Sequence, residues 1–281
     1  MLKQRVITAL VLLGILLPAL FYPSPVPFGV VAMLLVGAGA WEWGRLSGYG
    51  QASAFLAGTI CLVLCGAAWW MGILAQPLTS LWMLAGTAWM LVSFCVLRGG
   101  VSLWVRLPRL LRLIFGIAVL WLTWLAVAQA RMIGINFLLS VLVLVWVADI
   151  FAYFAGKRFG GRWIQRKLAP TISPGKSWEG ALGGLMGVIA VAFFWRWIDT
   201  VWAVEARSFY SYIGMKSGWM LLMAVVLMVT MSVVGDLFES LVKRSAGVKD
   251  SSQLLPGHGG VLDRVDALLP TLPLAMMLYS M

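Results

Sequence analysis

The chain has 281 residues, of which 62% are hydrophobic and 11% are charged, whereas soluble globular proteins average about 45–50% and about 25%. So little polar surface excludes an ordinary water-soluble fold and indicates an integral membrane protein. The cations behind the net charge of +11 stand singly or in small groups between apolar stretches. This pattern argues against nucleic acid as a partner and favours anionic lipid head groups and membrane topology.

Long apolar runs predict an all-α membrane protein, because a transmembrane helix needs about 20 mainly apolar residues. We expect about nine transmembrane helices, near residues 6–22, 26–43, 53–75, 78–97, 111–130, 132–155, 181–198, 218–239 and 267–280. The N-terminus and the even-numbered connections hold 17 of the 21 Lys and Arg residues. By the positive-inside rule, the N-terminus is cytoplasmic and the C-terminus lies outside.

The acidic residues divide the chain into two regions. Residues 1–131 contain one acid, Glu42, and are predicted to form generic transmembrane helices of low information. The other nine acids lie in 132–281, which we expect to be a catalytic transmembrane region with two cytoplasmic polar loops.

Two acids interrupt apolar spans: Asp149 in LVWVADIFAYFAGKRFG and Asp236 in TMSVVGDLFESLVKR. A carboxylate in hydrocarbon costs about 2.5–3.5 kcal/mol and marks a candidate functional site, the alternative being a buried ion pair. Both are expected one to two turns from the cytoplasmic ends of their helices. Glu239 and Ser240 share a helix face with Asp236, so this oxygen-rich face predicts a Mg²⁺ site, unless it is only a polar stripe facing an aqueous loop.

The densest polar segment is KRSAGVKDSSQLLPGHGGVLDRVD, residues 243–266. Glycines around His258 permit a sharp turn and a close approach of backbone amides to an anion. Asp263 and Asp266, three residues apart, are expected to point into one pocket. Cations for phosphates alternate here with carboxylates for a metal, which favours a binding site over a merely solvated loop.

A second polar segment, APTISPGKSWEG, precedes the seventh expected span. It is similar to a Walker A loop at GKS, but Pro170 stands where that loop needs glycine, which excludes a P-loop. Lys176 remains a candidate point charge for a phosphate, with Ser173 and Ser177 as hydrogen-bond donors. A helix N-cap is the alternative role for this segment.

The run from Ser240 to Asp266 resembles the signature of phosphatidate cytidylyltransferases, also called CDP-diglyceride synthases. The segments D-x-x-A-Y-F-x-G-K-x-F-G at 149–160 and S-P-x-K-S-W-E-G at 173–180 are also similar to that family. The resemblance implies transfer of CMP from CTP to phosphatidate of the cytoplasmic leaflet, giving CDP-diacylglycerol and pyrophosphate. It also implies a requirement for Mg²⁺, with a second cation in the same site, and a bacterial cytoplasmic (inner) membrane with the active site facing the cytoplasm.

The resemblance and the residue patterns together give a set of candidate site residues. Asp236 and Asp263 are expected to bind the metal jointly, with Asp149 and Glu239 as further ligands. Catalytic candidates are Asp236, Lys249, Asp250, His258, Asp263, Arg264 and Asp266. Candidates for substrate and phosphate binding are Ser173, Lys176, Ser177, Ser240, Lys243, Arg244, Gly259 and Gly260.

Two other functions stay open at this point. A CTP-dependent kinase of a polyprenol or other lipid would use the same nucleotide, and a cation- or proton-coupled transporter would use Asp149 and Asp236 as intramembrane carboxylates. The oligomeric state is also open, with a homodimer as one arrangement. Replacing Asp236 or Asp263 with Asn is expected to remove most activity, whereas Asp199, expected in an outward-facing loop, should tolerate Asn.

Overall fold

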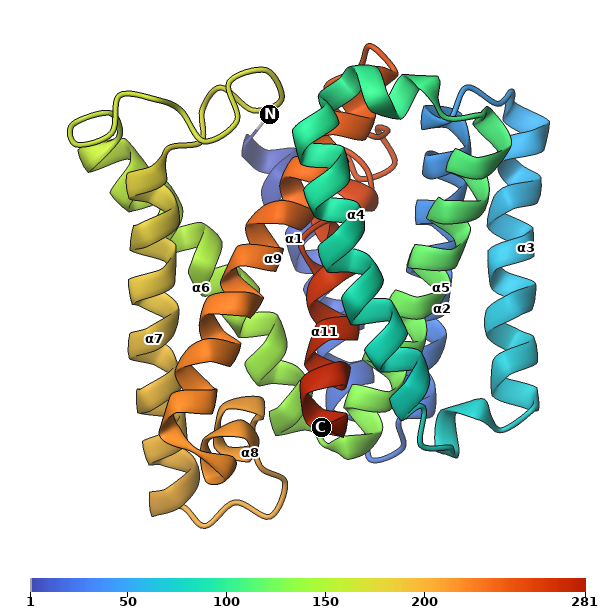
Figure 1. Ribbon diagram of the computed structural model, residues 1–281. Coiled ribbons are helices and arrows are strands. Elements are labelled where there is room, and N and C mark those ends of the chain that lie inside the picture. The colour runs from blue at the N-terminus through green and yellow to red at the C-terminus, as the bar shows by residue number, and fades with distance from the viewer. Residues whose placement is uncertain (1) are drawn as a thin grey trace.

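The computed structural model describes residues 2–281, in which every regular element is a helix (Figure 1). Seven of these helices are long and apolar enough to cross a membrane, and the count is eight if the bent helix α4 is one span. The long helices are α1 (Leu2–Phe21), α2 (Val26–Leu46), α3 (Gln51–Trp70), α4 (Thr79–Arg106), α5 (Arg109–Ile133), α6 (Ile135–Phe159), α7 (Trp178–Val201) and α9 (Gly218–Ser245). An all-α membrane fold is thus confirmed.

The expected count of nine spans is not reached, because the last apolar run forms a shorter helix. After α10 (Leu262–Val265) the chain continues through Asp266 and Ala267 into α11 (Leu268–Ser280). The 13 residues of α11 extend over about 20 Å, less than the ~30 Å of a hydrocarbon core. The remaining short elements are η1 (Ile73–Ala75) and α8 (Phe209–Lys216).

Helix α4 is bent by 98° between Thr79–Cys95 and Arg98–Arg106. The backbone leaves helical geometry at Gly100, whose φ is 63°, a conformation that glycine adopts without steric cost. The second half of α4 consequently runs across one end of the bundle instead of continuing along it (Figure 1).

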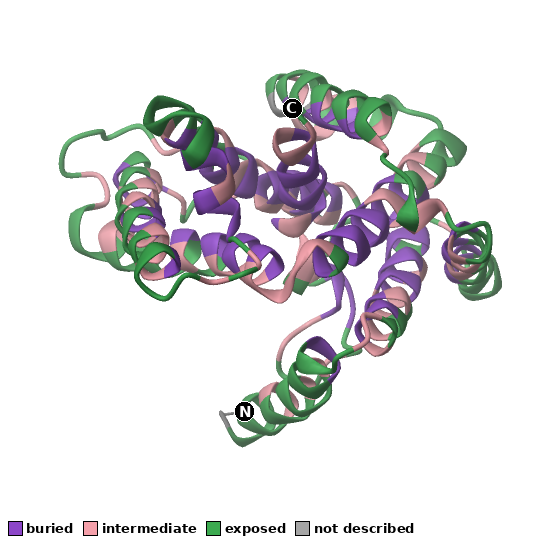
Figure 2. Cartoon of the chain, turned by 90° about the horizontal axis from the view of Figure 1, so that it is seen from below, coloured by how far each residue is buried: buried purple, intermediate pink, exposed green. Residues whose placement is uncertain are grey.

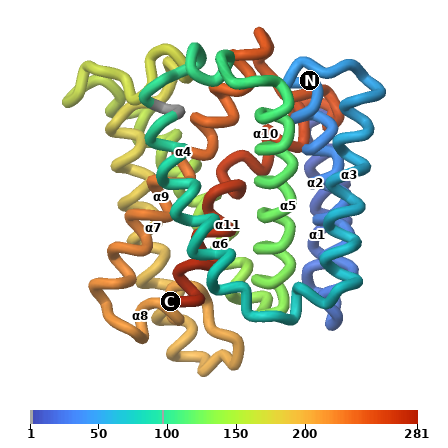
Figure 3. The backbone as a smooth tube through the Cα atoms, turned by 45° about the vertical axis from the view of Figure 1, so that its right-hand side comes forward, coloured from blue at the N-terminus to red at the C-terminus, as the bar shows by residue number. Residues whose placement is uncertain are grey.

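The polar loops gather at one end of the helix bundle. The connection between α6 and α7 and the connection between α9 and α10 both lie at the end where α1 begins, and α11 ends at the opposite end (Figures 1 and 3). We call residues 246–261, between α9 and α10, the signature loop. The two polar segments singled out in the sequence therefore meet at a common end.

The long helices differ in burial. In α5 and α9, 56% and 61% of the most apolar window is buried, whereas in α1 the share is 11%. Figure 2 shows α1 standing away from the rest of the bundle with a mostly exposed surface. Because the exposed side chains of α1 are apolar from Val6 onward, this surface suits contact with lipid tails.

Helices α6 and α7 pack closely through small residues. A Cβ added to Gly184 of α7 would lie 2.7 Å from the carbonyl oxygen of Ala148, and one added to Gly183 would overlap Ala155. Small residues let two membrane helices approach backbone to backbone. This packing places Asp149 of α6 beside the N-terminal half of α7.

An aromatic cluster joins the N-terminal helices to α9. Phe238 of α9 stacks on Trp43 of α2 at a centroid distance of 6.1 Å and meets Trp104 of α4 edge-on at 5.3 Å. Phe115 of α5 and Trp89 of α4 complete the cluster. Residues 1–131 thus pack directly against the part of the chain that holds the candidate site.

The expectation for Asp199 is wrong, because α7 runs to Val201 and carries this residue in its last turn. Asp199 is 6% exposed. It accepts hydrogen bonds from Asn136 Nδ2 at 2.9 Å, from the Ser208 backbone amide at 3.1 Å and from Ser211 Oγ at 2.6 Å, and from the Ser208 hydroxyl. Asp199 is therefore a structural residue that ties the end of α7 to α6 and α8.

Candidate active site

A cavity of about 450 Å³ with four charged side chains in its wall, called here the polar cavity, lies between α6, α7, α9 and the loop that precedes α7. The Lys176 ammonium lies 2.7 Å from Asp236 Oδ2 in an ion pair whose side chains are 24% and 35% exposed. The cavity is also lined by Asp149, Lys157 and Ser177. It therefore combines cations and carboxylates in a place that water and small solutes reach.

Both cavity acids lie deeper than one to two turns from the helix ends. Helix α9 continues to Ser245 and α6 to Phe159, so Asp236 and Asp149 lie about 14 and 15 Å below those ends at 1.5 Å per residue. Lys176 reaches Asp236 from the loop before α7. An ion pair, one of the two roles expected for Asp236, is present, but it faces a cavity.

The start of α7 fixes the loop that carries Lys176. Ser177 is the N-cap of α7, and its hydroxyl accepts a hydrogen bond from the Gly180 amide at 3.2 Å. Glu179 Oε1 accepts hydrogen bonds from the amides of Trp163 and Ile164 at 3.0 and 2.9 Å. Ser177 thus has both expected positions, as a helix cap and as part of the cavity wall. Ser173 lies in the same loop, outside the cavity lining.

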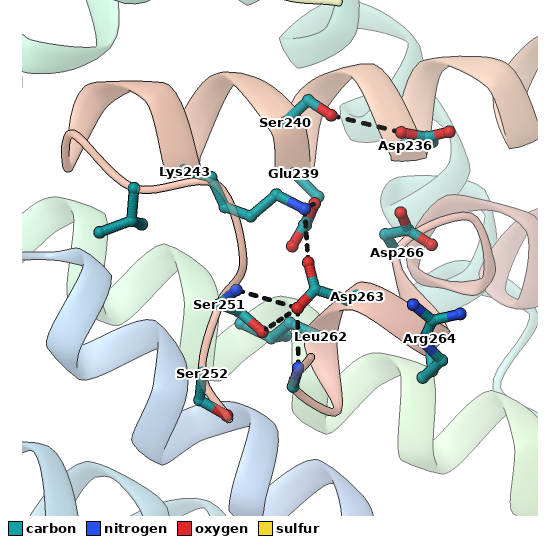
Figure 4. Close-up of polar contacts among 12 residues, drawn as sticks. Asp236, Glu239, Ser240, Lys243, Ser251, Ser252, Leu262, Asp263, Arg264 and Asp266 are labelled. Atoms are coloured by element: carbon teal, nitrogen blue, oxygen red, sulfur yellow. Dashed lines mark hydrogen bonds and ion pairs between the residues drawn. The ribbon is translucent and has the colours of Figure 1, made fainter. Parts of the chain in front are cut away.

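A second, more deeply buried cluster lies at the end of α9 (Figure 4). The Lys243 ammonium lies 2.5 Å from a carboxylate oxygen of Glu239 and 2.5 Å from Asp263 Oδ1. The three side chains are 12%, 1% and 8% exposed, respectively. This arrangement leaves little room for a ligand between the charges.

Asp263 is fixed by the signature loop as well as by Lys243. Its Oδ2 accepts hydrogen bonds from the Ser251 amide at 2.9 Å, the Ser251 hydroxyl at 2.8 Å and the Gly260 amide at 2.8 Å. Burial by itself would raise the pKa of Asp263, but the Lys243 ammonium and the two amides outweigh it and hold the pKa below its ordinary value.

Glu42 of α2 belongs to the same region, although no role was predicted for it. Its side chain is 0% exposed. Its oxygens accept hydrogen bonds from the hydroxyls of Ser251 at 3.0 Å and Ser252 at 2.5 Å, and from the amides of Val261 at 2.9 Å and Leu262 at 2.8 Å. A single acid in an otherwise apolar span was the available signal, because such a carboxylate is costly unless it is hydrogen-bonded.

The glycines beside His258 allow the close approach to an anion that the sequence predicts. The anionic groups beside them are the carboxylates of Asp263 and Glu42. Gly259 has a φ of 82°, and a Cβ there would lie 2.7 Å from Asp263 Oδ2. A Cβ at Gly260 would overlap Ser251 Oγ and Glu42 Oε1.

Other candidates surround these clusters. Arg244, Lys249, Asp250 and Arg264 are exposed, and Arg264 Nε donates to the His258 carbonyl at 3.1 Å. His258 Nδ1 is buried without a hydrogen-bond partner. Asp266 accepts from the Ala267 amide at 2.8 Å and projects toward the face of α9 that carries Asp236 (Figure 4). Ser240 donates to Asp236 at 3.3 Å.

The structure does not bring Asp236 and Asp263 together as one ligand pair. Asp236 forms an ion pair with Lys176 and Asp263 forms one with Lys243, and Asp263 is not part of the cavity lining. Within residues 2–281, no group of three His, Cys, Asp or Glu side chains is arranged to hold a metal ion. Asp236 and Asp149, which share the cavity, fit a hard cation that takes its other oxygens from phosphate or water.

An apolar groove of about 550 Å³ adjoins the cavity between α7 and α9. Both spaces are lined by Leu168, Ala181, Val229 and Val233, and Arg166 lies at the groove. The cavity suits a charged, water-soluble ligand and the groove suits apolar chains. Fold and site together define a membrane protein in which a polar ligand and an amphipathic one can meet.

The chain matches the model of the cytidylyltransferase family over residues 3–281 and belongs to this family. A protein of Pseudomonas aeruginosa named phosphatidate cytidylyltransferase is 40% identical over 285 residues, which cover 100% of this chain and 98% of the relative. A protein of the same name from Haemophilus influenzae is 37% identical over 99% of both chains. Another, from Thermotoga maritima, is 38% identical over 50% of this chain and 48% of its own. The family indicated by the resemblance is confirmed.

Proposed function

We propose that the chain is a phosphatidate cytidylyltransferase, which transfers CMP from CTP to phosphatidate and releases pyrophosphate. The observation that carries this proposal is the continuity of the Lys176–Asp236 cavity with the apolar groove between α7 and α9. Phosphatidate stays in the membrane while CTP stays in water, so their phosphates can react only where a polar space adjoins an apolar one. Family membership and the names of the relatives support the same substrates.

In this reaction a phosphate oxygen of phosphatidate attacks the α-phosphorus of CTP. The new P–O bond forms as the bond between the α-phosphorus and the oxygen bridging to the β-phosphorus breaks, and pyrophosphate leaves with the electron pair. Such a displacement needs positioning and charge neutralisation more than covalent help from the protein. Lys176 and Lys157 in the cavity wall would neutralise phosphate charge, and Arg166 would hold the lipid phosphate beside the groove.

We further propose that Mg²⁺ binds beside Asp236 and Asp149 together with the CTP phosphates. These carboxylates and the Ser240 hydroxyl offer oxygen donors, which are the ligands that Mg²⁺ prefers. When bound, the cation would neutralise charge on the transferring phosphoryl group. A second cation in the same space is part of this proposal.

The same proposal includes a membrane orientation. The end of the bundle with both polar loops faces the cytoplasm, and α10 and α11 lead the chain toward the other side, where α11 ends. The excess of Lys and Arg at the loop end supports this orientation, as does the position of the chain ends at opposite ends of the bundle. For a bacterial chain, the proposed location is the cytoplasmic (inner) membrane, with the active site facing the cytoplasm.

The test uses the purified full chain in detergent with Mg²⁺, phosphatidate and CTP labelled at the α-phosphate. We expect label in CDP-diacylglycerol, an equal amount of pyrophosphate, and no consumption of CTP without phosphatidate. Release of CDP with a phosphorylated lipid would instead identify a lipid kinase. A lack of turnover with any lipid would overturn the proposal and favour the transporter.

A further inference from the structure

We infer that Glu42 is a positioning residue that holds the signature loop and, through the loop, the donors that fix Asp263. The inference deepens the proposed function and rests on it. Glu42 lies in α2, more than 200 residues before its partners, as the separations of 209 to 220 positions show. Its hydrogen bonds all go to residues outside the cavity lining, so any effect on turnover must act through the loop.

Glu42 joins the two limbs of the signature loop. Ser251 and Ser252 belong to the limb that leaves α9, whereas Val261 ends the loop and Leu262 is the first residue of α10. The Val261 and Leu262 amides and the Ser252 hydroxyl donate to this carboxylate, and the Ser251 hydroxyl shares its one hydrogen between Glu42 and Asp263. Among the described residues, no Lys or Arg forms an ion pair with Glu42, so these hydrogen bonds are what stabilises a charge at 0% exposure.

The carboxylate of Glu42 is connected to Asp263 through one loop residue. Ser251 Oγ lies 3.0 Å from Glu42 and 2.8 Å from Asp263 Oδ2. Gly260, which would clash with Glu42 if it had a side chain, donates its amide to Asp263. A displacement of the loop from Glu42 would therefore move the donors that fix Asp263.

The helix that carries Glu42 is itself fixed against α9. The next residue, Trp43, stacks on Phe238 at 6.1 Å with an interplanar angle of 26°, and Phe238 precedes Glu239 of the buried cluster. Trp43 Nε1 also donates to the Arg112 carbonyl at 2.8 Å. Glu42 and α9 thus have a fixed separation, and the loop between them is held from both sides.

Glutamine cannot replace Glu42, although it has the same shape. Oε1 accepts from the Val261 amide and Oε2 from the Leu262 amide. Since a backbone N–H cannot reverse its direction, either orientation of a Gln side chain sets an NH₂ group against a donor. Glu42→Gln should therefore release one limb of the loop and leave a buried donor without an acceptor.

The matched control is Asp199, another buried carboxylate with four hydrogen bonds, located in the last turn of α7. We expect Glu42→Gln to lower kcat/KM for CTP by about 10- to 100-fold, as for the loss of a charge-assisted hydrogen bond, with KM for phosphatidate unchanged. Asp199→Asn should lower thermal stability and leave KM for CTP as it is. Ser252→Ala, which removes one of the four hydrogen bonds, should shift KM for CTP in the same direction by a few-fold and decides the matter if Glu42→Gln does not fold.

Hydrogen exchange of the amides of Val261 and Leu262 gives a measurement that does not depend on turnover. These amides should exchange faster in Glu42→Gln and in Ser252→Ala than in the unmodified protein, and at an unchanged rate in Asp199→Asn. The inference is overturned if exchange is unchanged, if kcat/KM for CTP stays within twofold, or if Asp199→Asn reproduces the loss. If the unmodified protein fails to convert CTP and phosphatidate while exchange behaves as expected, the proposed function fails and the positioning role stands.

Discussion

Two lysine–carboxylate clusters flank the same stretch of α9, and they differ in burial. Lys176 and Asp236 meet in a cavity with side chains 24% and 35% exposed. Lys243 meets Glu239 and Asp263 with side chains 12%, 1% and 8% exposed. The difference shows which cluster can change partners: a phosphate or a cation can compete for the first, whereas the second is closed by burial and by the hydrogen bonds of Asp263.

The same lysine–carboxylate interaction has a different role in each cluster. In the cavity, water screens the pair and the interaction is weak enough to be exchanged during a reaction. In the buried cluster, each charge depends on the others because none can be resolvated without opening the structure. We therefore assign ligand binding to the cavity and loop support to the buried cluster.

Lysine-to-methionine substitutions provide the sharpest test of this assignment. Lys243→Met leaves Glu239 and Asp263 buried without a cation and should destabilise the protein by about 3–5 kcal/mol. Lys176→Met leaves Asp236 in contact with solvent and should change stability by less than about 1 kcal/mol, while turnover falls. Thermal unfolding in detergent, followed by helical circular dichroism, measures both. Equal losses of stability would show that the two clusters do not differ as described.

Asp236→Asn should affect activity rather than stability. Removing one electrostatic stabiliser of a transition state typically costs about 10²–10³ in rate, and the amide keeps the size of the carboxylate. The measurement is kcat with CTP and phosphatidate in membranes where expression has been verified. Glu205→Gln, an exposed acid between α7 and α8, serves as the control and should leave kcat unchanged. Normal turnover by Asp236→Asn, with an unchanged Mg²⁺ requirement, would remove Asp236 from the site.

Asp263→Asn should lower stability and activity together. An Asn side chain would set its NH₂ group against either Lys243 or the donors of Ser251 and Gly260, at a cost of about 1.5–3 kcal/mol for charge-assisted hydrogen bonds. The unfolding midpoint and kcat are measured on the same preparation. If Asp263→Asn loses activity at full stability, as expected for Asp236→Asn, the metal site shared by the two carboxylates that the resemblance implies regains support.

The sequence predicted the helices well where hydrophobic length decides the structure. The apolar runs near 6–22, 111–130 and 132–155 correspond to α1, α5 and α6. It predicted the helix ends less well, because α9 stays helical through the polar residues up to Ser245, which pack against the signature loop. The break at Asp266 was also not foreseen, since hydropathy does not report the local backbone path.

Only part of the site could be predicted from the sequence, because some of its contacts join residues that are far apart in the chain. Lys243, Glu239 and Asp263 could be expected together because they are close in the chain and rich in charge. Glu42 could not be assigned, because its partners lie more than 200 positions away and nothing in spacing identifies them. An acid in an apolar span is costly and marks a candidate functional residue. We applied this rule to Asp149 and Asp236, which line the cavity, and it applies equally to Glu42.

The smallest expected effect is that of Asp199→Asn. This buried carboxylate lies in the last turn of α7, at the end of the helix away from both lysine–carboxylate clusters. The Asn carbonyl can still accept from Ser208 and Ser211, but its NH₂ group would face Asn136 Nδ2, which cannot turn because Asn136 Oδ1 accepts from Trp195 Nε1 at 2.8 Å. One hydrogen bond is lost, so stability should fall by about 1 kcal/mol. Turnover at a temperature well below unfolding should stay normal, because none of these residues lines the polar cavity or the groove. A loss of turnover larger than the loss of stability would mean that the two ends of the bundle are coupled.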